Sequence, residues 1–332
     1  MYCTGKLESL RDIWGTQEVV LNADSVVVRN QAYPVVDDVI ILLDPSLYPD
    51  HLRRRLASPR RDSVRSTNDF AEDIQFTFGE EWKKFPRILP EHECEFRQYF
   101  DLIDLSRLRN SRVCDLGCGI GRWSYFLHAK CREIVLIDFS EAIFVARENL
   151  RNVPNALFFM GDLKRLPFRD DFADLIFCLG VLHHLPTCAL EEVQRLKRYA
   201  PELLIYLYYA LDNRPMHFRL VLGIVTWLRK LLSKVSNATF RSVFTDLATL
   251  GFYVPLVWLG KALRPLRWSH YVPVAEAYHG KSLERIRQDV YDRFFTSIEQ
   301  RFSRRQIEQL NQRFAQVIVS EQLPYWHFLC CR

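Results

Sequence analysis

The chain has 332 residues, which is long enough to bury a large core and to contain more than one domain. Hydrophobic residues make up 48% of it and the formal net charge is +5, so the composition excludes a disordered chain and does not by itself indicate a nucleic-acid-binding protein. The nine cysteines are irregularly spaced and odd in number, which argues against a disulfide framework and favours a reducing cytoplasm.

Residues 1–45 predict a small β-rich module, and they show no basic-then-apolar signal pattern, so a cytoplasmic protein is expected. The apolar runs Val19–Leu21, Ser25–Val28 and Val39–Leu43 alternate with turn-forming residues and predict two or three short strands. Cys3 is the only cysteine of this module. Because one thiolate cannot form a tetrahedral zinc site, no metal is expected.

Residues 46–75 predict a linker, because prolines and small polar residues accompany two arginine clusters, Arg53–Arg55 and Arg60–Arg61. Charge runs of this kind are usually solvated. After the linker, Phe76–Trp82 is rich in aromatic residues, and Glu91–Leu108 has the pattern of an amphipathic helix that leads into the first core strand.

The stretch Val113–Arg122 predicts a ligand-binding turn between a buried strand and a helix. Glycines at alternate positions from Gly117 to Gly121 let the backbone approach a ligand, and the following helix directs free N–H groups towards it. The dinucleotide-binding fingerprint is absent, because Arg122 or Ser124 stands where its third glycine would fall.

The pattern Asp-x-Gly-x-Gly-x-Gly, from Asp115 to Gly121, resembles motif I of the Rossmann-like S-adenosylmethionine methyltransferases. The resemblance implies S-adenosyl-L-methionine as cofactor and S-adenosyl-L-homocysteine as product. The second strand, Glu133–Asp138, ends in a carboxylate that can accept two hydrogen bonds from a ribose diol. The third, Ala156–Asp162, ends in an aspartate that by resemblance faces the adenine amino group.

The fourth strand, Asp174–Cys178, is followed by Leu179–Leu185, which by resemblance borders the methyl-transfer site. His183 and His184 are the candidate catalytic residues, because an imidazole near neutral pH can take a hydroxyl proton. The expected cofactor-binding residues are Asp115, Gly117, Cys118, Gly119, Gly121, Asp138, Phe139, Gly161, Asp162, Leu163 and Leu179. The candidate flap or substrate residues are Phe78, Trp82, Tyr206 and Tyr208, although ordinary packing explains the aromatic pair of the flap equally well.

Strands that alternate with helices predict an α/β fold with a doubly wound, mostly parallel seven-stranded sheet. Its S-adenosylmethionine-binding core spans residues 76–210, and a last helix with two closing antiparallel strands follows at 303–332. Ser140, Thr187 and Ser303 are the expected N-caps of three helices.

Residues 211–302 form an insertion after the fifth strand, longer than the minimal fold needs. Its apolar runs, Phe218–Leu232 and Leu247–Gly260, fall short of the ~20 residues that cross a bilayer, and glycine and proline interrupt the second. We expect a helical cap over the substrate. Its apolar content and basic borders favour a hydrophobic substrate or shallow membrane contact, and core helices of an enlarged domain or a dimer face explain it equally well.

The chain is therefore identified as similar to the small-molecule methyltransferases, which include the ubiquinone and menaquinone enzymes, with an oxygen acceptor favoured. Cys178–Val181 stands where enzymes that methylate base or amide nitrogens have Asn-Pro-Pro-Tyr, so no nucleic-acid partner is expected. Residues 33–43 resemble part of the Trm112-like zinc-ribbon modules. An RNA- or protein-modifying enzyme that docks its target through this module, and a non-catalytic scaffold with a vestigial cofactor site, are the alternatives.

Overall fold

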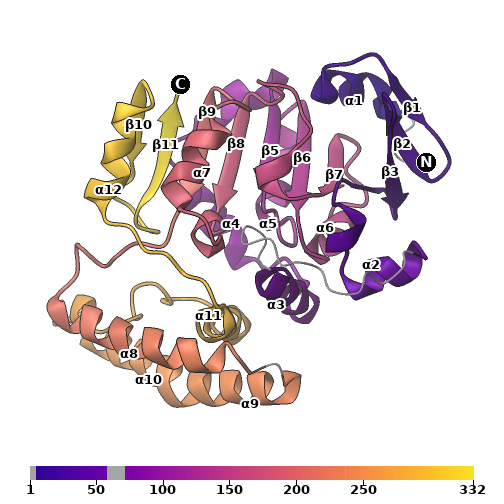
Figure 1. Cartoon of the computed structure of the whole chain (residues 1–332). Helices are drawn as coiled ribbons and strands as arrows, with labels where there is room; N and C mark the ends of the chain where they lie inside the picture. Colours follow the sequence, from indigo (N-terminus) through magenta and orange to yellow (C-terminus); the bar gives the residue numbers. More distant parts are fainter. Residues whose placement is uncertain (1–4, 58–71, 236) are drawn as a thin grey trace.

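The computed structural model describes residues 5–57, 72–235 and 237–332. The expectations for Cys3 and for the Arg60–Arg61 cluster therefore lie outside the described residues. Within them, the chain forms one mixed sheet with helices on both faces and a helical cap at the C-terminal ends of the parallel strands (Figure 1).

The sheet has eleven strands in the order β1-β2-β3-β4-β7-β6-β5-β8-β9-β11-β10. Neighbouring strands from β4 to β9 in this order pair in parallel, and β11 and β10 close the other edge with antiparallel pairing. The strands are β1 Val19–Leu21, β2 Ser25–Val28, β3 Gln31–Val36, β4 Val39–Ile41, β5 Arg112–Leu116, β6 Glu133–Asp138, β7 Ala156–Met160, β8 Leu175–Leu179, β9 Glu202–Tyr206, β10 Gln316–Val319 and β11 His327–Cys331.

The expected seven strands are present, but the N-terminal module is continuous with them rather than a separate body. Strand β4 pairs in parallel with β7, with Val39 opposite Phe158, so the four N-terminal strands extend the core sheet. Strand β7 is buried along its whole length, and an unpaired edge there would leave backbone groups without partners. Pairing with β4 satisfies them.

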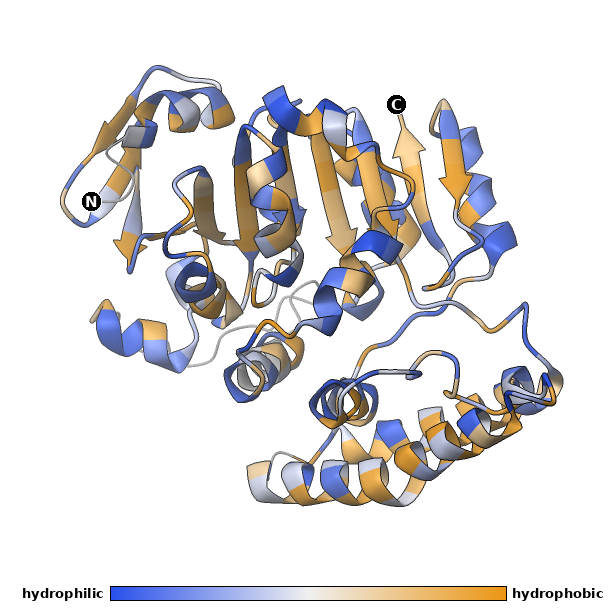
Figure 2. Cartoon of the chain, turned by 180° about the vertical axis from the view of Figure 1, so that it is seen from behind, coloured by the Kyte–Doolittle hydropathy of each residue, from blue (hydrophilic) through white to orange (hydrophobic). Residues whose placement is uncertain are grey.

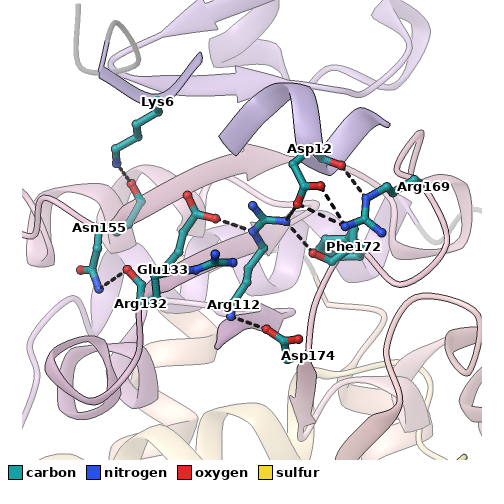
Figure 3. A network of polar contacts seen from close by, with 10 residues as sticks. Lys6, Asp12, Arg112, Arg132, Glu133, Asn155, Arg169, Phe172 and Asp174 are labelled. Atoms are coloured by element: carbon teal, nitrogen blue, oxygen red, sulfur yellow. Dashed lines mark hydrogen bonds and ion pairs between the residues drawn. The ribbon is translucent and has the colours of Figure 1, made fainter. Parts of the chain in front are cut away.

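A polar network fixes helix α1 (Leu7–Trp14) to the core, as Figure 3 shows. The guanidinium of Arg112, at the start of β5, donates to Asp12 at 2.6 Å and to the carbonyl of Phe172 at 2.8 Å, and it also pairs with Glu133. Arg169 donates to the backbone carbonyl of Asp12 at 2.7 Å. Because these partners come from α1, β5 and β6, the network joins the module to the sheet.

The two faces of the sheet are buried by different helices. Cys114 and Leu116 point into a cluster with α1, α7 and α12, whereas Val113 points into the opposite cluster with α2, α4, α5 and α6. The helices are α2 Asp50–Arg55, α3 Glu72–Lys84, α4 Glu91–Tyr99, α5 Arg122–Leu127, α6 Ala142–Asn149, α7 Ala189–Leu196 and α12 Arg304–Glu308. The helix expected over 91–108 ends at Tyr99, and a short 3₁₀ helix at Leu105–Asn110 follows it.

The three expected helix caps have different outcomes. Ser303 is confirmed, because it forms a reciprocal capping box with Gln306. The hydroxyl of Ser140 accepts from the backbone N–H of Ala142 at 3.3 Å, one residue ahead of the formal cap position. The prediction that Thr187 is an N-cap is wrong. The free N–H of Ala189 donates instead to the side chain of Gln300 at 3.1 Å, and Gln300 lies far away in the sequence.

The cap consists of α8 (Met216–Leu232), α9 (Ala238–Ala248), a π-helical turn (Thr249–Tyr253), α10 (Val254–Leu263) and α11 (Leu283–Phe295). The turn joins α9 and α10 without a break, so the expectation that glycine and proline interrupt the apolar run 247–260 is wrong. Pro255 is tolerated because it lies in the first turn of α10.

This continuous helix, Ala238–Leu263, is long and apolar enough to cross a bilayer by length and composition alone, and 22% of its most apolar window is buried. The expectation that no apolar run reaches that length is therefore also wrong. Helix α11 packs against α8 and α9 through an apolar cluster that includes Val290, Phe294 and Phe295. It lies between the outer cap helices and the sheet (Figure 1).

Candidate functional site

The glycine turn between β5 and α5 requires glycine for its backbone and for its neighbours. Gly117, Gly119 and Gly121 have φ values of +78°, +54° and +72°, a region that other residues rarely adopt. A Cβ atom on Gly117 would lie 2.4 Å from Val181, and one on Gly121 would lie 2.7 Å from Leu150. The turn therefore brings bare backbone close to the ends of β6, β7 and β8.

A cavity of about 80 Å³ lies over this turn. Nine of the eleven expected cofactor-binding residues line it, and Asp115 and Gly121 do not. His184 and the expected flap residues Phe78 and Trp82 also line it, whereas His183, Tyr206 and Tyr208 do not. The nine residues are Gly117, Cys118, Gly119, Asp138, Phe139, Gly161, Asp162, Leu163 and Leu179. Their assignment as ligands stays a prediction.

Asp138, the last residue of β6, is held by hydrogen bonds from both sides. One carboxylate oxygen accepts from the N–H of Gly119 at 2.9 Å, and the other accepts from the N–H and hydroxyl of Ser140 at 2.8 and 2.7 Å. Burial raises the pKa of Asp138, and the hydrogen bonds from Ser140 and Gly119 oppose that rise. A carboxylate has about four lone-pair sites and three are occupied, so one site remains for a hydroxyl of a ribose.

Asp115 lies behind the glycine turn rather than in the cavity. Its carboxyl group is buried, and the hydroxyl of Ser124 on α5 donates to it at 2.6 Å. Burial raises the pKa of Asp115 to about 7. The residue therefore ties β5 to α5, and it supports the turn from beneath.

Arg122, the first residue of α5, is a site residue that the sequence did not reveal. Its guanidinium lies 5.1 Å from the ring centre of Trp82 and 4.6 Å from that of Trp123, and it lines the cavity. Its buried Nη1 atom has no hydrogen-bond partner among the described residues. A buried cation of this kind fits a carboxylate ligand, such as the amino-acid end of S-adenosylmethionine.

Helix α3 covers the cavity over the glycine turn. The indole of Trp82 would lie 3.1 Å from a Cβ atom on Gly119, so its ring rests on the glycine turn. A volume of about 80 Å³ is well below the roughly 300–1,000 Å³ of small-molecule sites. Helix α3 therefore covers the expected cofactor site, while Asp138, Arg122 and the glycine turn supply groups that fit the sugar, carboxylate and nucleoside of the cofactor.

A larger groove of about 630 Å³ lies between α4 and α10. Its lining includes Arg97, Asp101, Lys261 and His279, and it contains none of the expected cofactor residues. The smaller cavity, at the carboxyl ends of parallel strands next to a helix N-terminus, has the chemistry of a nucleoside site.

The two histidines after β8 have different environments. The Nδ1 atom of His184 lies 2.7 Å from the carbonyl oxygen of Ile298, so Nδ1 carries the proton and Nε2 is left as an acceptor. His183 is buried and stacks on Tyr208 with ring centres 3.9 Å apart. Burial lowers its pKa well below the ordinary value, so it stays neutral. Only His184 reaches the cavity.

A buried polar layer joins the core to α3 and α11. The hydroxyl of Tyr208 donates to Asp292 of α11 at 2.5 Å. Glu81 of α3 is 2% exposed, and burial, followed by the neighbouring charge of Asp292, raises its pKa well above the ordinary value. Gln288 of α11 also bonds to Glu81. We call these four residues the polar layer.

One sequence pattern predicts the α11 part of this layer. Arg285, Gln288, Asp289 and Asp292 follow the spacing of one helix face, yet they are buried, or nearly so. Glu81 has no comparable local signal. Its burial depends on α11, which lies far away in the chain.

The geometry defines a class of protein, and comparison with known families agrees with it. Residues 113–199 match the family model described as "Methyltransferase domain". This stretch contains the glycine turn, Asp138, Asp162 and His184. The chain therefore carries an S-adenosylmethionine-dependent methyltransferase domain, and its cofactor is S-adenosyl-L-methionine.

Among curated proteins, the chain is similar to "Probable tRNA methyltransferase 9B" of Homo sapiens, with 26% identity over 137 residues, and to that of Bos taurus, with 25% identity over 191 residues. These matches cover 40% and 56% of this chain but 29% and 37% of the relatives. The chain thus spans about a third of the length of the curated relatives.

Solved structures of methyltransferases are also similar to part of the chain. One is phosphoethanolamine N-methyltransferase 1 of Haemonchus contortus, with 19% identity and a TM-score of 0.34 over 41% of this chain and 32% of that one. Another is the complex of the Haloferax volcanii Trm112 methyltransferase activator with a methyltransferase, with 18% identity and a TM-score of 0.31 over 40% and 61% of the two chains. Similarity at this level identifies no substrate.

Proposed function

We propose that the chain transfers a methyl group from S-adenosylmethionine to an oxygen of a small-molecule acceptor. The observation that carries the proposal is His184, which lines the cofactor cavity with its tautomer set by the carbonyl of Ile298. S-adenosylmethionine supplies an activated methyl group when bound. The Nε2 atom of His184 takes the proton that a hydroxyl acceptor must lose.

The surroundings of this histidine support an acceptor with a polar reacting end. The polar layer lies beside it, where the rings of His184 and Tyr208 are 5.5 Å apart and Tyr208 bonds to Asp292. The hydrophobic acceptor expected from the cap sequence has no counterpart here, because the apolar side chains of α8 to α10 pack on α11 or face outward. The enclosing helices α3 and α11 favour a small molecule over a polymer.

The names of the curated relatives favour a second candidate, the methylation of tRNA. In that case the acceptor nucleotide would have to enter beneath α3, past the acidic side chains of Glu81 and Asp292. The resemblance of the N-terminal module to Trm112-like modules belongs to this alternative. Because the module is built into the sheet, it would act as part of the target-binding surface.

Transfer of a labelled methyl group separates the candidates. The full chain is incubated with methyl-labelled S-adenosylmethionine and either a small-molecule extract of the producing cells or total tRNA. We expect label in the small-molecule fraction, and a loss of about 10²–10⁴-fold for His184→Ala, the usual contribution of a general base. His270→Ala, an exposed histidine of the cap, is the matched control.

Label in tRNA instead would replace the first candidate with the second. Absence of transfer to either fraction, together with little binding of S-adenosylmethionine, would identify a non-catalytic scaffold with a vestigial cofactor site. Loss of activity in His270→Ala as well would show that the effect of His184→Ala is not specific to the site.

A further inference from the structure

The outer surface of the cap is apolar to a degree not found elsewhere on the described chain. Helix α8 and the Ala238–Leu263 helix pack on α11 with one side and leave the other side exposed (Figures 1 and 2). Among the described residues, sixteen of the twenty large hydrophobic side chains that are exposed belong to residues 216–271. Phe252 and Trp258 are each 72% exposed. We call the exposed side of these two helices the outer cap face.

The same segment has a larger net positive charge than the whole chain. Residues 216–271 contain eight Lys or Arg and one Asp, a net charge of +7 (8 − 1), whereas the whole chain has +5, which leaves −2 for the remainder. The single acid, Asp246, is paired at 2.6 Å with Arg287 of α11. Within the described chain, the exposed Lys230 and Lys234 have no ion-pair partner.

We propose that the outer cap face lies in the plane of an anionic lipid bilayer. The aromatic side chains of Trp227, Phe252 and Trp258 enter the boundary between headgroups and acyl chains, where such rings are favoured. The lysines meet the lipid phosphates, because their long side chains place the charge at the headgroup level. The interaction is independent of the proposed methyl acceptor.

The combination of charge and apolar surface argues against the other occupants. A second copy of the chain would bring two such positively charged segments together across a symmetric interface, which like charges oppose. An RNA would pair with the lysines, but it would leave the exposed leucines, isoleucine and valines of this face in water. A bilayer satisfies both kinds of side chain.

The contacts of the Ala238–Leu263 helix favour a position in the membrane plane over a transmembrane one. Its inner side chains, including Phe244 and Val257, belong to the cluster around α11. Arg241 is buried and donates to the carbonyl of Val235 at 2.6 Å. A helix that crossed the bilayer would lose these contacts and carry Arg241 into hydrocarbon, which is costly.

Flotation with lipid vesicles tests the proposal on the full chain. Vesicles of phosphatidylcholine alone are compared with equimolar phosphatidylcholine and phosphatidylglycerol, at low and at high salt. The chain is expected to float with the anionic vesicles and to dissociate in part at high salt. The double variant Phe252→Ser/Trp258→Ser should bind at least about tenfold more weakly, because two large apolar side chains no longer enter the lipid.

Charge is tested with Lys230→Gln/Lys234→Gln, for which a loss of about fivefold per removed charge is expected. The matched controls are Tyr125→Ser and Lys130→Gln, which alter an exposed aromatic and an exposed lysine of the core and should bind like the parent. Unchanged binding of S-adenosylmethionine by every variant establishes that each is folded.

Four results would overturn the proposal. The first is a folded chain that floats with neither vesicle. The second is a parent chain that forms a dimer by light scattering and does not bind vesicles, when the Phe252→Ser/Trp258→Ser variant is a monomer. The third is retention of tRNA that the lysine variant removes, without any vesicle binding. Equal loss in the core controls would show non-specific adsorption, which also contradicts it.

Discussion

Asp138 combines burial with three hydrogen bonds, so its carboxylate is fixed before any ligand arrives. If it accepts a ribose hydroxyl, Asp138→Ala should weaken the binding of S-adenosylmethionine by about 1–3 kcal/mol, the cost of a lost hydrogen-bonded partner. Isothermal titration of parent and variant measures the change. Asp24→Ala, at an exposed turn, should bind like the parent. Equal affinity of the Asp138 variant and the parent would refute the ribose assignment.

Gly117 allows the strain of the turn to be separated from its crowding. Gly117→Ala combines a positive φ with a Cβ atom 2.4 Å from Val181, and it should lower the free energy of unfolding by about 2–5 kcal/mol. Gly280→Ala has a similar φ of +76° but no atom within 4 Å, and should cost only about 1–2 kcal/mol. Urea unfolding measures both. Equal losses would mean that crowding against Val181 contributes nothing.

Asp115 predicts a pH dependence of stability. Its pKa is raised by burial to about 7 in the folded protein, whereas the unfolded chain has released this proton above about pH 4. The folded state therefore binds more protons in this range, so the group makes stability fall as pH rises from about 4 to about 7, with no further change above. In Asp115→Asn this contribution is absent, and the free energy of unfolding should fall less over the same range.

Urea unfolding at a series of pH values measures the difference between this variant and the parent. Other buried acids, Glu81 among them, also make the free energy of unfolding fall as pH rises. The test is therefore the difference in pH dependence between the variant and the parent. Asp24→Asn is the exposed control and should follow the parent. If the free energy of unfolding of Asp115→Asn had the same pH dependence as that of the parent, Asp115 would not be the group that binds this proton.

Residues of the glycine turn and the strand-end acids were predictable because their signals are local: an apolar strand, a turn and an acid within a few positions. Arg122, Glu81 and Asp292 were not, because their roles arise from burial by α3 and α11. His183 and His184 are equivalent in the sequence. Only the carbonyl of Ile298 and the ring of Tyr208 distinguish them.

Among the secondary-structure elements, α7 depends on a residue from outside its own segment. Gln300 accepts from the N–H of Ala189 and donates to the carbonyls of Leu185 and Thr187 at 2.9 and 2.7 Å. Gln300→Ala should lower the free energy of unfolding by about 1–3 kcal/mol, because it leaves buried backbone groups unpaired. Thr187→Ala, which removes a hydroxyl without a partner among the described residues, should change it by less than about 0.5 kcal/mol. Chemical denaturation distinguishes the two, and the reverse order would restore Thr187 as the cap.

Element types were largely predictable from periodicity, whereas boundaries and connections were not. The seven core strands follow from apolar runs that alternate with helical segments. The N-terminal module joins the core sheet because β4 pairs with the edge strand β7, a contact between residues far apart in the chain. The continuity of α9 and α10 depends on the π-helical turn before Pro255. This turn lets the helix continue through a proline that the sequence pattern predicts to end it.

At the scale of the whole molecule, two features lie at opposite sides of the cap. Its inner helix α11 contributes Asp292 and Gln288 to the polar layer beside the core. Its outer side carries the exposed aromatic residues, and residues 216–271 have a net charge of +7. The composition of the entire chain conceals this division, because the negative remainder cancels part of the positive cap. Counting charge by segment makes it visible.

The central claim is that S-adenosylmethionine binds between the glycine turn and α3. Hydrogen exchange of the full chain, with and without this cofactor, tests it most directly. We predict slower exchange of backbone amides at 117–121 and 179–185, together with a changed rate along α3 (Glu72–Lys84). Protection confined to the groove between α4 and α10, or no change anywhere at saturating cofactor, would contradict the account.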